Sequence, residues 1–282
     1  MHFSNLIVGI LGCGKISSCV VRGLMSTSES SPTRIFVSQR NENKARRLQQ
    51  EFPNTVEIRC NEDIVRDSDV IFIGLLPATA REVLPGLAEL FTGKLVVSMM
   101  ATVDMQELLL LLSLPQDSQQ IVRTVPLPSC ARNEGPILVY PPHPRFVELL
   151  TALGTVVGCE DELLMKPMVA LTGHISSFFE LMHETQKFMT SEGVPLEAAR
   201  TYTSSFYSSL ARSTELTSEG FEELALEAAT PGGINEQSMA FLKATEHFEA
   251  HAQSLVNILA RLREKPREES AETSSRDTKY KV

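Results

Sequence analysis

The alternation of hydrophobic and polar positions divides the chain into two halves of different character. Short apolar runs in the first half predict strands at Leu6–Leu11, Thr33–Ser38, Val56–Ile58, Val70–Ile73, Lys94–Ser98 and Gln120–Val125. Helix-forming stretches between them lie at Asn41–Phe52, Ala78–Phe91 and Met105–Leu112, and Pro85 is expected to interrupt the second. Repeated strand and helix units predict an α/β fold with a doubly wound, parallel Rossmann sheet.

The second half has the longer spacing of amphipathic helices. Apolar residues recur every three or four positions from Asp161 to Thr190, which predicts one long helix. A second helix is expected after Pro195, a third after a capping Ser218, and a fourth over Ile234–Leu262. We expect an all-α domain whose apolar faces pack within the chain or in a homodimer. Periodicity does not separate these two alternatives.

Length and composition fit two domains. Residues 1–158 would form the Rossmann domain, residues 159–264 the helical domain, and the charged, serine-rich residues 265–282 a flexible tail. A formal net charge of -9 argues against a nucleic-acid partner. Five cysteines without a C-x-x-C pair indicate reduced thiols. We find no apolar run of about 18 residues, and the first strand begins so close to Met1 that no leader is expected, so we expect a cytoplasmic protein without a membrane span.

A two-glycine turn joins the first apolar run to a helical segment in the order Gly9-Ile10-Leu11-Gly12-Cys13-Gly14-Lys15-Ile16. In dinucleotide-binding domains the first glycine permits a tight turn, and the second lets the backbone approach the pyrophosphate at the helix N-terminus. Ser17 stands at the third position of the usual fingerprint. The pattern therefore predicts a pyrophosphate site, and its alternative is a turn that only links strand to helix.

The residues after the second strand bear on the choice of cofactor. NAD-specific sites usually place Asp or Glu there, where the carboxylate accepts hydrogen bonds from the ribose. This chain has Ser38-Gln39-Arg40-Asn41 instead. A guanidinium and a hydroxyl favour a 2′-phosphate, so we predict NADP(H). In the alternative interpretation, Arg40 is a solvated residue at a helix start, where its charge is mildly unfavourable.

A second turn lies far downstream, at Thr230-Pro231-Gly232-Gly233-Ile234-Asn235, directly before a helix. Such a turn exposes backbone N–H groups at a positive helix end, where a substrate carboxylate would bind. A plain connection between helices explains the same residues. His247 and His251 are four residues apart without an apparent third ligand, so no metal site is expected.

The order of these motifs resembles the pyrroline-5-carboxylate reductase family from about Val8 to Arg263. The matching stretches are GILGCGKI with VVRGL behind it, VSQRN, Asn61 before Ser68-Asp69-Val70, LLP at 75–77, VVSMMA ending at Ala101, EG at 134–135, LTG at 171–173 and TPGG at 230–233. Members of that family reduce the C=N bond of a cyclic imino acid with NAD(P)H to give L-proline. They join a Rossmann domain to a helical domain that forms an interlocked homodimer, often assembled further into rings.

The resemblance implies a role for each matching residue. The cofactor would be held by Gly12, Cys13, Gly14, Lys15 and Ile16 at the pyrophosphate, Ser38 and Arg40 at the 2′-phosphate, Asn61 near the adenine ribose, and Leu76, Pro77 and Ala101 on the nicotinamide side. The substrate would contact Ser176 and, through its carboxylate, Thr230, Gly232 and Gly233.

Several substrate-side positions depart from the family pattern. The family's Ser-Gly-Ser-Gly-Pro-Ala run reads Thr172-Gly173-His174-Ile175-Ser176-Ser177 here, so His174 replaces the central serine. Asn235 replaces a threonine, Leu76 a lysine, and Val125–Ser129 a Met-Pro-Asn-Thr-Pro-like segment. His174 and Asn235 are the catalytic candidates, because a histidine with an ordinary pKa of about 6.5 could protonate the ring nitrogen. Alternatively, His174 is a structural residue beside an apolar stripe.

Three functions are compatible with these residues. The first is an NADPH-dependent reductase of pyrroline-5-carboxylate in proline biosynthesis. The second is a reductase of a different imine or carbonyl compound on the same scaffold, for which the changes at His174, Asn235 and Leu127 speak. The third is a non-catalytic NADP-binding regulator, because the same changes remove expected substrate contacts.

Overall fold

The computed structural model describes residues 3–26 and 31–263, and the tail expected at 265–282 lies outside them. Two units pack separately, Met1–Met165 and Lys166–Val282. The first unit therefore extends past residue 158 and includes a short segment after its last strand.

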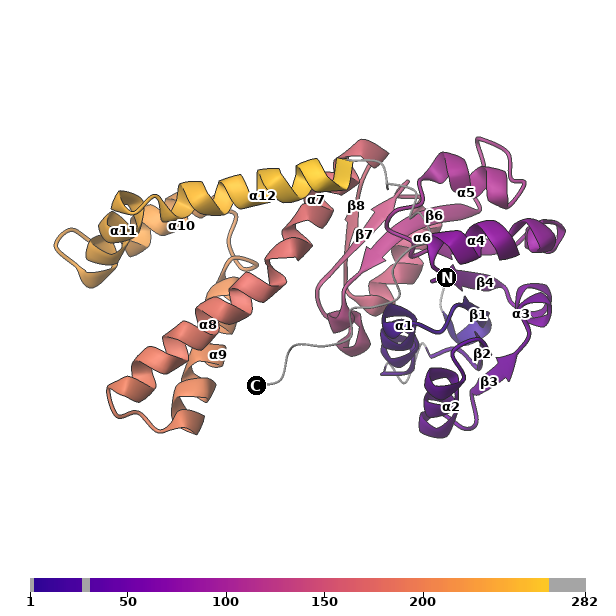
Figure 1. Ribbon diagram of the computed structural model, residues 1–282, viewed down its shortest axis with the longest axis horizontal. Helices are drawn as coiled ribbons and strands as arrows, with labels where there is room; N and C mark the ends of the chain where they lie inside the picture. Colours follow the sequence, from indigo (N-terminus) through magenta and orange to yellow (C-terminus); the bar gives the residue numbers. More distant parts are fainter. Residues whose placement is uncertain (1–2, 27–30, 264–282) are drawn as a thin grey trace, which may run out of the picture. The chain divides into compact units, whose positions relative to one another are not determined.

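An eight-stranded sheet forms the centre of the first unit, in the order β3-β2-β1-β4-β5-β6-β7-β8 (Figure 1). Its strands are β1 Ile7–Leu11, β2 Arg34–Ser38, β3 Val56–Arg59, β4 Val70–Ile73, β5 Leu95–Ser98, β6 Ile121–Pro126, β7 Pro136–Tyr140 and β8 Thr155–Gly158. All neighbours are parallel except β6 and β7. The doubly wound α/β prediction is confirmed, with β7 and β8 as additional strands.

Helices cover both faces of this sheet, and each face has its own apolar core. The helices are α1 Lys15–Ser26, α2 Glu42–Glu51, α3 Asn61–Asp67, α4 Pro77–Val83, α5 Met105–Leu111 and α6 Pro144–Leu150, with 3-10 turns at Phe3–Asn5, Pro85–Phe91, Pro128–Arg132, Thr151–Leu153 and Glu162–Leu164. Along β4, Val70 and Phe72 belong to one core while Ile71 and Ile73 belong to the other. A strand buried on both faces explains why this run is wholly apolar. Pro85 ends α4 as expected.

The second unit is helical. Its elements are α7 Met165–Ala170, which begins at the last residue of the first unit, a 3-10 turn η6 Leu171–His174, α8 Ile175–Ser191, α9 Leu196–Ser213, α10 Phe221–Ala228, α11 Ile234–Ala244 and α12 His247–Arg263. The all-α prediction is confirmed.

Two of the expected long helices are wrong in their continuity. The stretch from Asp161 to Thr190 is interrupted by η6, where Gly173 lies so close to α12 that an added Cβ would come 2.7 Å from Ile258. The stretch over Ile234–Leu262 breaks at Glu246, whose φ of 54° lies in the left-handed region and ends the helical path. The spacing of apolar residues does not indicate either of these helix breaks.

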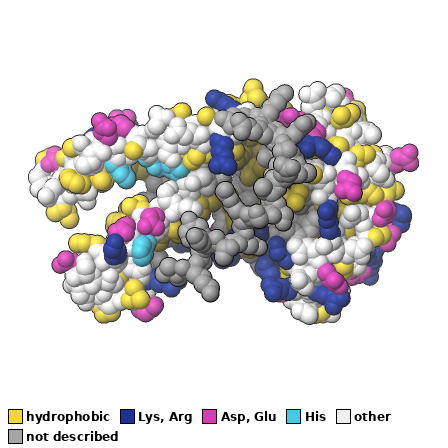
Figure 2. Space-filling view, in the orientation of Figure 1, with side chains coloured by type: hydrophobic (Ala, Val, Ile, Leu, Met, Phe, Trp, Pro, Cys, Tyr) yellow, Lys and Arg dark blue, Asp and Glu magenta, His cyan; other side chains and the backbone are white. Residues whose placement is uncertain are grey.

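The helical unit leaves its apolar side chains uncovered. Among its described residues only Ala170, Ala199 and Thr203 are buried. Large apolar side chains on α8 and α9 remain exposed, including Phe179 at 62% and Phe206 at 47%. Figure 2 shows hydrophobic side chains along the outside of these helices. The amphipathic faces predicted from the sequence are therefore not packed within this unit.

Candidate functional site

The glycine loop after β1 is fixed by its own backbone and by two serines. Gly12 has a φ of 88°, and an added Cβ would come 2.5 Å from the carbonyl oxygen of Gly74, so only glycine fits this position. Its N–H donates to Ser38 Oγ at 2.9 Å, and its carbonyl accepts from Ser17 Oγ at 2.6 Å. The loop is thus braced from β2, β4 and α1 together.

The space above the loop suits a phosphate group. A Cβ added at Gly14 would meet nothing within 4 Å, so the backbone is open to a ligand there. Helix α1 begins at Lys15, and the N–H groups of its first turn, including those of Lys15 and Ile16, have no acceptor within the helix. These donors lie at the positive end of the helix dipole.

Cys13 contributes backbone and apolar bulk to the loop. Its side chain is buried, and burial raises the pKa of the thiol above its ordinary value. The thiol is therefore neutral at physiological pH and packs with the apolar core on that face of the sheet.

Arg40 follows β2 and extends to the neighbouring element. Its Nη1 donates to Thr79 Oγ1 on α4 at 2.9 Å. Its side chain contacts no carboxylate among the described residues, so its charge is not neutralised within the first unit. A guanidinium held by a neutral hydroxyl remains able to bind an anion.

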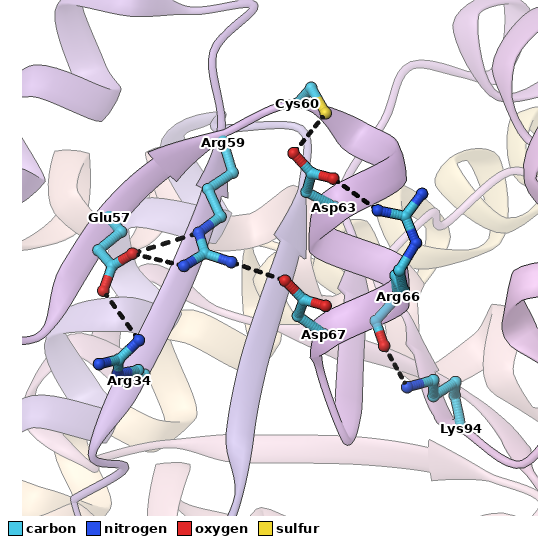
Figure 3. A network of polar contacts seen from close by, with 8 residues as sticks. All are labelled: Arg34, Glu57, Arg59, Cys60, Asp63, Arg66, Asp67 and Lys94. Carbon is cyan, nitrogen blue, oxygen red and sulfur yellow. Dashed lines mark hydrogen bonds and ion pairs between the residues drawn. The ribbon is translucent and has the colours of Figure 1, made fainter.

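Arg59, at the end of the adjacent strand β3, differs from Arg40 because carboxylates already pair with its guanidinium. It bonds the Glu57 carboxylate and Asp67, and its guanidinium lies 3.7 Å from the ring centre of Phe36. The hydrogen bond with Glu57 raises the pKa of Arg59 above its usual value. Figure 3 shows this network along β3 and α3. Two carboxylates therefore already neutralise Arg59, whereas Arg40 has no carboxylate partner among the described residues and remains able to bind a phosphate.

The remaining cofactor candidates follow β3, β4 and β5, where the carboxyl ends of parallel strands meet. Asn61 begins α3, Pro77 begins α4 directly after Leu76, and Ala101 lies in the turn between β5 and α5. Leu76 is 75% exposed and Ala101 is also exposed, whereas Asn61 and Pro77 are half-buried. The topology therefore brings all predicted cofactor residues to one edge of the sheet.

Residues outside the predicted set also shape this edge. Gly74 directly follows β4, and a Cβ added there would come 2.4 Å from Ser17 Oγ. Thr79 holds Arg40. The glycine at the end of a wholly apolar strand was a usable signal for Gly74, whereas nothing local in the sequence indicates the role of Thr79.

In the helical unit His174 belongs to a small polar cluster. Its Nε2 lies 3.1 Å from Ser254 Oγ, and its ring packs edge-on against His251 with centroids 4.4 Å apart. Both partners come from α12. Ser176 is exposed in the first turn of α8. Within the described residues, no group of three His, Cys, Asp or Glu side chains is arranged to hold a metal ion.

The turn at Thr230–Gly233 is held by internal hydrogen bonds. Gly232 has a φ of 73°, and the N–H of Gly233 donates to the Thr230 carbonyl at 2.9 Å. Asn235 Nδ2 donates to the Ala228 carbonyl at 3.1 Å. The N–H of Gly232 donates to Glu236 Oε2 at 2.7 Å, so a carboxylate from this chain occupies a donor that was expected to face substrate.

The structure thus groups the predicted residues into three places. The cofactor candidates share one edge of the sheet, His174 packs on α12, and Thr230, Gly232, Gly233 and Asn235 form the turn before α11. No hydrogen bond or ring contact joins His174 to that turn within residues 166–263.

Comparisons with known proteins identify similar sequences for part of the first unit and for most of the chain. A family model described as "NADP oxidoreductase coenzyme F420-dependent" matches residues 7–102. A pyrroline-5-carboxylate reductase of Methanosarcina acetivorans is 26% identical over 70% of this chain and 74% of its own length. One of Glycine max is 31% identical, but over only 36% of this chain and 37% of its own.

A solved structure shares the whole architecture. The Plasmodium falciparum pyrroline carboxylate reductase, crystallised with NADP bound, has a TM-score of 0.75 at 16% identity over 92% of this chain and 98% of its own. A Rossmann sheet with a glycine loop and a following helical unit define a dinucleotide-type oxidoreductase. The sequence relatives and this solved structure show that the chain is similar to pyrroline-5-carboxylate reductases and shares their fold. The proposed resemblance is confirmed.

No helix in the described part of the chain has the length and apolarity that a membrane crossing requires.

Proposed function

We propose that this protein is an NADPH-dependent reductase of a cyclic imine, with pyrroline-5-carboxylate as substrate and L-proline as product. The observation that carries the proposal is the glycine loop, where Gly12 adopts a φ of 88° and a Cβ at Gly14 would meet nothing within 4 Å, so the backbone is open to a phosphate group. Proline biosynthesis in the cytoplasm is the corresponding cellular role.

The sheet edge supplies the groups that NADPH needs. The N–H groups at Cys13–Ile16 would hold the pyrophosphate and Arg40 the 2′-phosphate. Asn61 would lie near the adenine ribose, while Leu76, Pro77 and Ala101 would support the nicotinamide half. When bound, NADPH supplies the hydride that reduces the C=N carbon.

The chain has little further chemistry to perform. A protonated imine is already electrophilic, so the main task is to orient it and hold its carboxylate still. We assign carboxylate binding to the turn at Thr230–Gly233, with Asn235 and Ser176 as further substrate contacts. His174 is proposed to deliver a proton to the ring nitrogen, with Ser254 orienting its imidazole.

A homodimer through the helical unit is part of the proposal. That unit exposes Phe179, Phe206 and other large apolar side chains along α8 and α9 and buries almost none. Monomeric proteins rarely expose apolar surface on this scale, and long amphipathic helices are frequently paired in symmetric dimers. Further assembly of dimers into rings would cover more of the same kind of exposed apolar surface.

One observation favours a second candidate, a reductase of an imine that lacks a neighbouring carboxylate. Glu236 already accepts the hydrogen bond of Gly232 and places a negative charge at the turn. A substrate carboxylate would have to displace it. The replacement of the family serine by His174 is a second change among the predicted substrate residues.

Turnover assays separate the two candidates. Purified protein is mixed with NADPH and either pyrroline-5-carboxylate or 1-pyrroline, which has the same ring without the carboxylate, while NADPH oxidation and product are followed. Proline formation with a preference for the carboxylate substrate supports the first candidate. A preference for 1-pyrroline supports the second, and NADPH binding without turnover of either imine contradicts both.

The variant Glu236→Gln tests the turn directly. Removing one exposed charge should lower the KM for pyrroline-5-carboxylate by about twofold to fivefold and leave that for 1-pyrroline unchanged. Glu249→Gln, an exposed carboxylate in the first turn of α12, serves as the control. Equal KM changes for both imines would show that Glu236 does not compete with a substrate carboxylate.

A further inference from the structure

Arg123 is a buried cation beside the sheet edge, and none of the assigned roles includes it. It lies in β6 and is 7% exposed. Its Nη2 donates to the carbonyl oxygens of Ala101 at 3.0 Å and Met100 at 3.5 Å, and its Nη1 pairs with the Glu162 carboxylate. The guanidinium is thus directed at the turn between β5 and α5.

Glu162 completes the attachment of that turn. The same carboxylate oxygen that pairs with Arg123 accepts the N–H of Met105 at 2.7 Å. Met105 is the first residue of α5, and Asp104 caps the helix from the N-cap position. The turn from Met100 to Met105 is therefore held at one end by Arg123 directly and at the other end through Glu162.

Stability alone does not account for a buried pair of this kind. Taking the Arg123 charge and part of the Glu162 carboxylate out of water is unfavourable, and uncharged side chains of similar volume often stabilise a protein as well or better. In addition, Arg123 Nε is buried without a hydrogen-bond partner among the described residues. What the pair provides specifically is a fixed position for two carbonyl groups and one N–H group of the turn.

We propose that Arg123 is a positioning residue for the hydride-transfer step, because it holds the turn that carries Ala101. This inference rests on the proposed function, in which that turn supports the nicotinamide half of the cofactor. The glycine loop and Arg40, which would hold the phosphate half, have no contact with the ion pair in the described structure. Arg123 should therefore affect the chemical step and the nicotinamide half, and leave the phosphate half unchanged.

The deciding variant is Arg123→Met with Glu162→Gln. It leaves no unpaired buried charge, and the glutamine oxygen can still accept the Met105 N–H, so the fold should survive. Arg123→Met alone strands the Glu162 carboxylate and is expected to lower stability. Arg132→Met removes an arginine from an exposed pair with Glu134 and is the control. Thermal unfolding is measured for each.

Activity and binding are then read separately. The double variant should show a single-turnover hydride-transfer rate about 10- to 100-fold lower, the loss expected from a small misplacement of reacting groups. Its affinity for adenosine 2′,5′-bisphosphate, which lacks nicotinamide, should be unchanged. A double variant that regains both stability and the wild-type hydride-transfer rate would show that Arg123 has only a structural role and would overturn the proposal.

Hydrogen exchange provides a readout that needs no turnover. NADPH should protect the amides of residues 99–105 in the wild type and in Arg132→Met but protect them less in the double variant, with equal protection of residues 9–16 in all three. Equal protection of residues 99–105 in all three proteins contradicts the role of Arg123. A wild type that protects this turn but reduces no imine counts against the proposed function and leaves the positioning role supported.

Discussion

The two units of this chain solve the problem of burying apolar surface in opposite ways. The sheet of the first unit is covered on both faces, and β4 contributes alternate residues to two cores. The helical unit buries only Ala170, Ala199 and Thr203 among its described residues and leaves rings such as Phe179 exposed. The first unit thus has the interior that independent folding requires, whereas the second leaves exposed the apolar faces that the proposed homodimer would cover.

This contrast also separates the chemistry. The groups proposed for the cofactor are positioned by strands and helix starts that are fixed within the first unit. The groups proposed for substrate, His174 and the turn before α11, lie on helices that lack a core of their own. We therefore expect cofactor binding to tolerate loss of assembly and substrate turnover to depend on it.

The largest expected effect comes from Phe179→Glu, which puts a charge on the exposed face of α8. If a second copy covers that face, association should weaken by about 30-fold or more, and the mass from light scattering should fall to that of a monomer. NADPH affinity should remain, while imine reduction should be lost. Leu110→Glu, at a residue of α5 that is 78% exposed, should leave the mass unchanged. Unchanged assembly in both variants would contradict the proposed interface.

The next prediction concerns the effect of an added side chain in the glycine loop of the first unit. Gly12→Ala forces a Cβ toward the Gly74 carbonyl in a left-handed conformation, so NADPH affinity should fall about tenfold or more and the melting temperature should drop. Gly14→Ala meets open space and should keep its melting temperature while still crowding the pyrophosphate. Calorimetric titration with circular dichroism melts measures both. Wild-type NADPH affinity in Gly12→Ala would exclude a pyrophosphate site at this loop.

A more selective effect is expected at Arg40. Arg40→Ala should weaken NADPH by about tenfold to a hundredfold, the range for lost charge-assisted hydrogen bonds, and leave NADH nearly unchanged. Thr79→Val removes the hydroxyl that holds the guanidinium and should give a smaller change in the same direction. Arg47→Ala, on α2, is the control. Equal weakening of both nucleotides would remove the basis for the NADP preference.

A last prediction concerns the closure of the sheet core and leaves binding and turnover unchanged. All five cysteines lie in the first unit, and burial raises the pKa of Cys130 to about 12. At pH 9.5 iodoacetamide should label native Cys130 about 100-fold or more slowly than the denatured chain, since only the denatured thiol ionises. Peptide mass spectrometry measures this ratio. Rapid labelling of native Cys130 would show that the apolar core around this thiol opens to solvent.

The sign of the linked stability change follows from the same pKa. Because the folded pKa of Cys130 exceeds the unfolded one, its contribution is fully present below about pH 8.5. It is lost as the pH rises toward 12, where the free energy of unfolding declines. Cys130→Ala should flatten this part of the pH profile relative to the wild type.

The sequence predicted the first unit better than the second for a physical reason. A strand buried on both faces, such as Val70–Ile73, is recognisable from its composition, and the glycine loop is recognisable because a left-handed Gly12 must be glycine. In the helical unit the same apolar spacing continues across η6 and Glu246. These interruptions depend on how Gly173 packs against Ile258 and on a single backbone angle.

Some contacts of the site could not be predicted from the local sequence. Thr79 and Glu162 act on residues tens of positions away in sequence, so no spacing rule links them to Arg40 or Ala101. The turn at Gly232 was recognisable from its sequence, but the hydrogen bond from the Gly232 N–H to the Glu236 carboxylate was not. The sequence indicated which residues belong to the site, but only the fold showed which hydrogen-bond partners they have.

The hydrogen bond from the Gly12 N–H to Ser38 constrains how cofactor preference can evolve in this protein. Ser38 is predicted to contact the 2′-phosphate, and its oxygen also accepts the hydrogen bond that braces the phosphate loop. Substitution at position 38 would alter nucleotide choice and loop geometry together. Position 40, whose side chain bonds only a threonine hydroxyl in the described structure, can change without disturbing the loop. A route from NADPH to NADH use would therefore begin at Arg40.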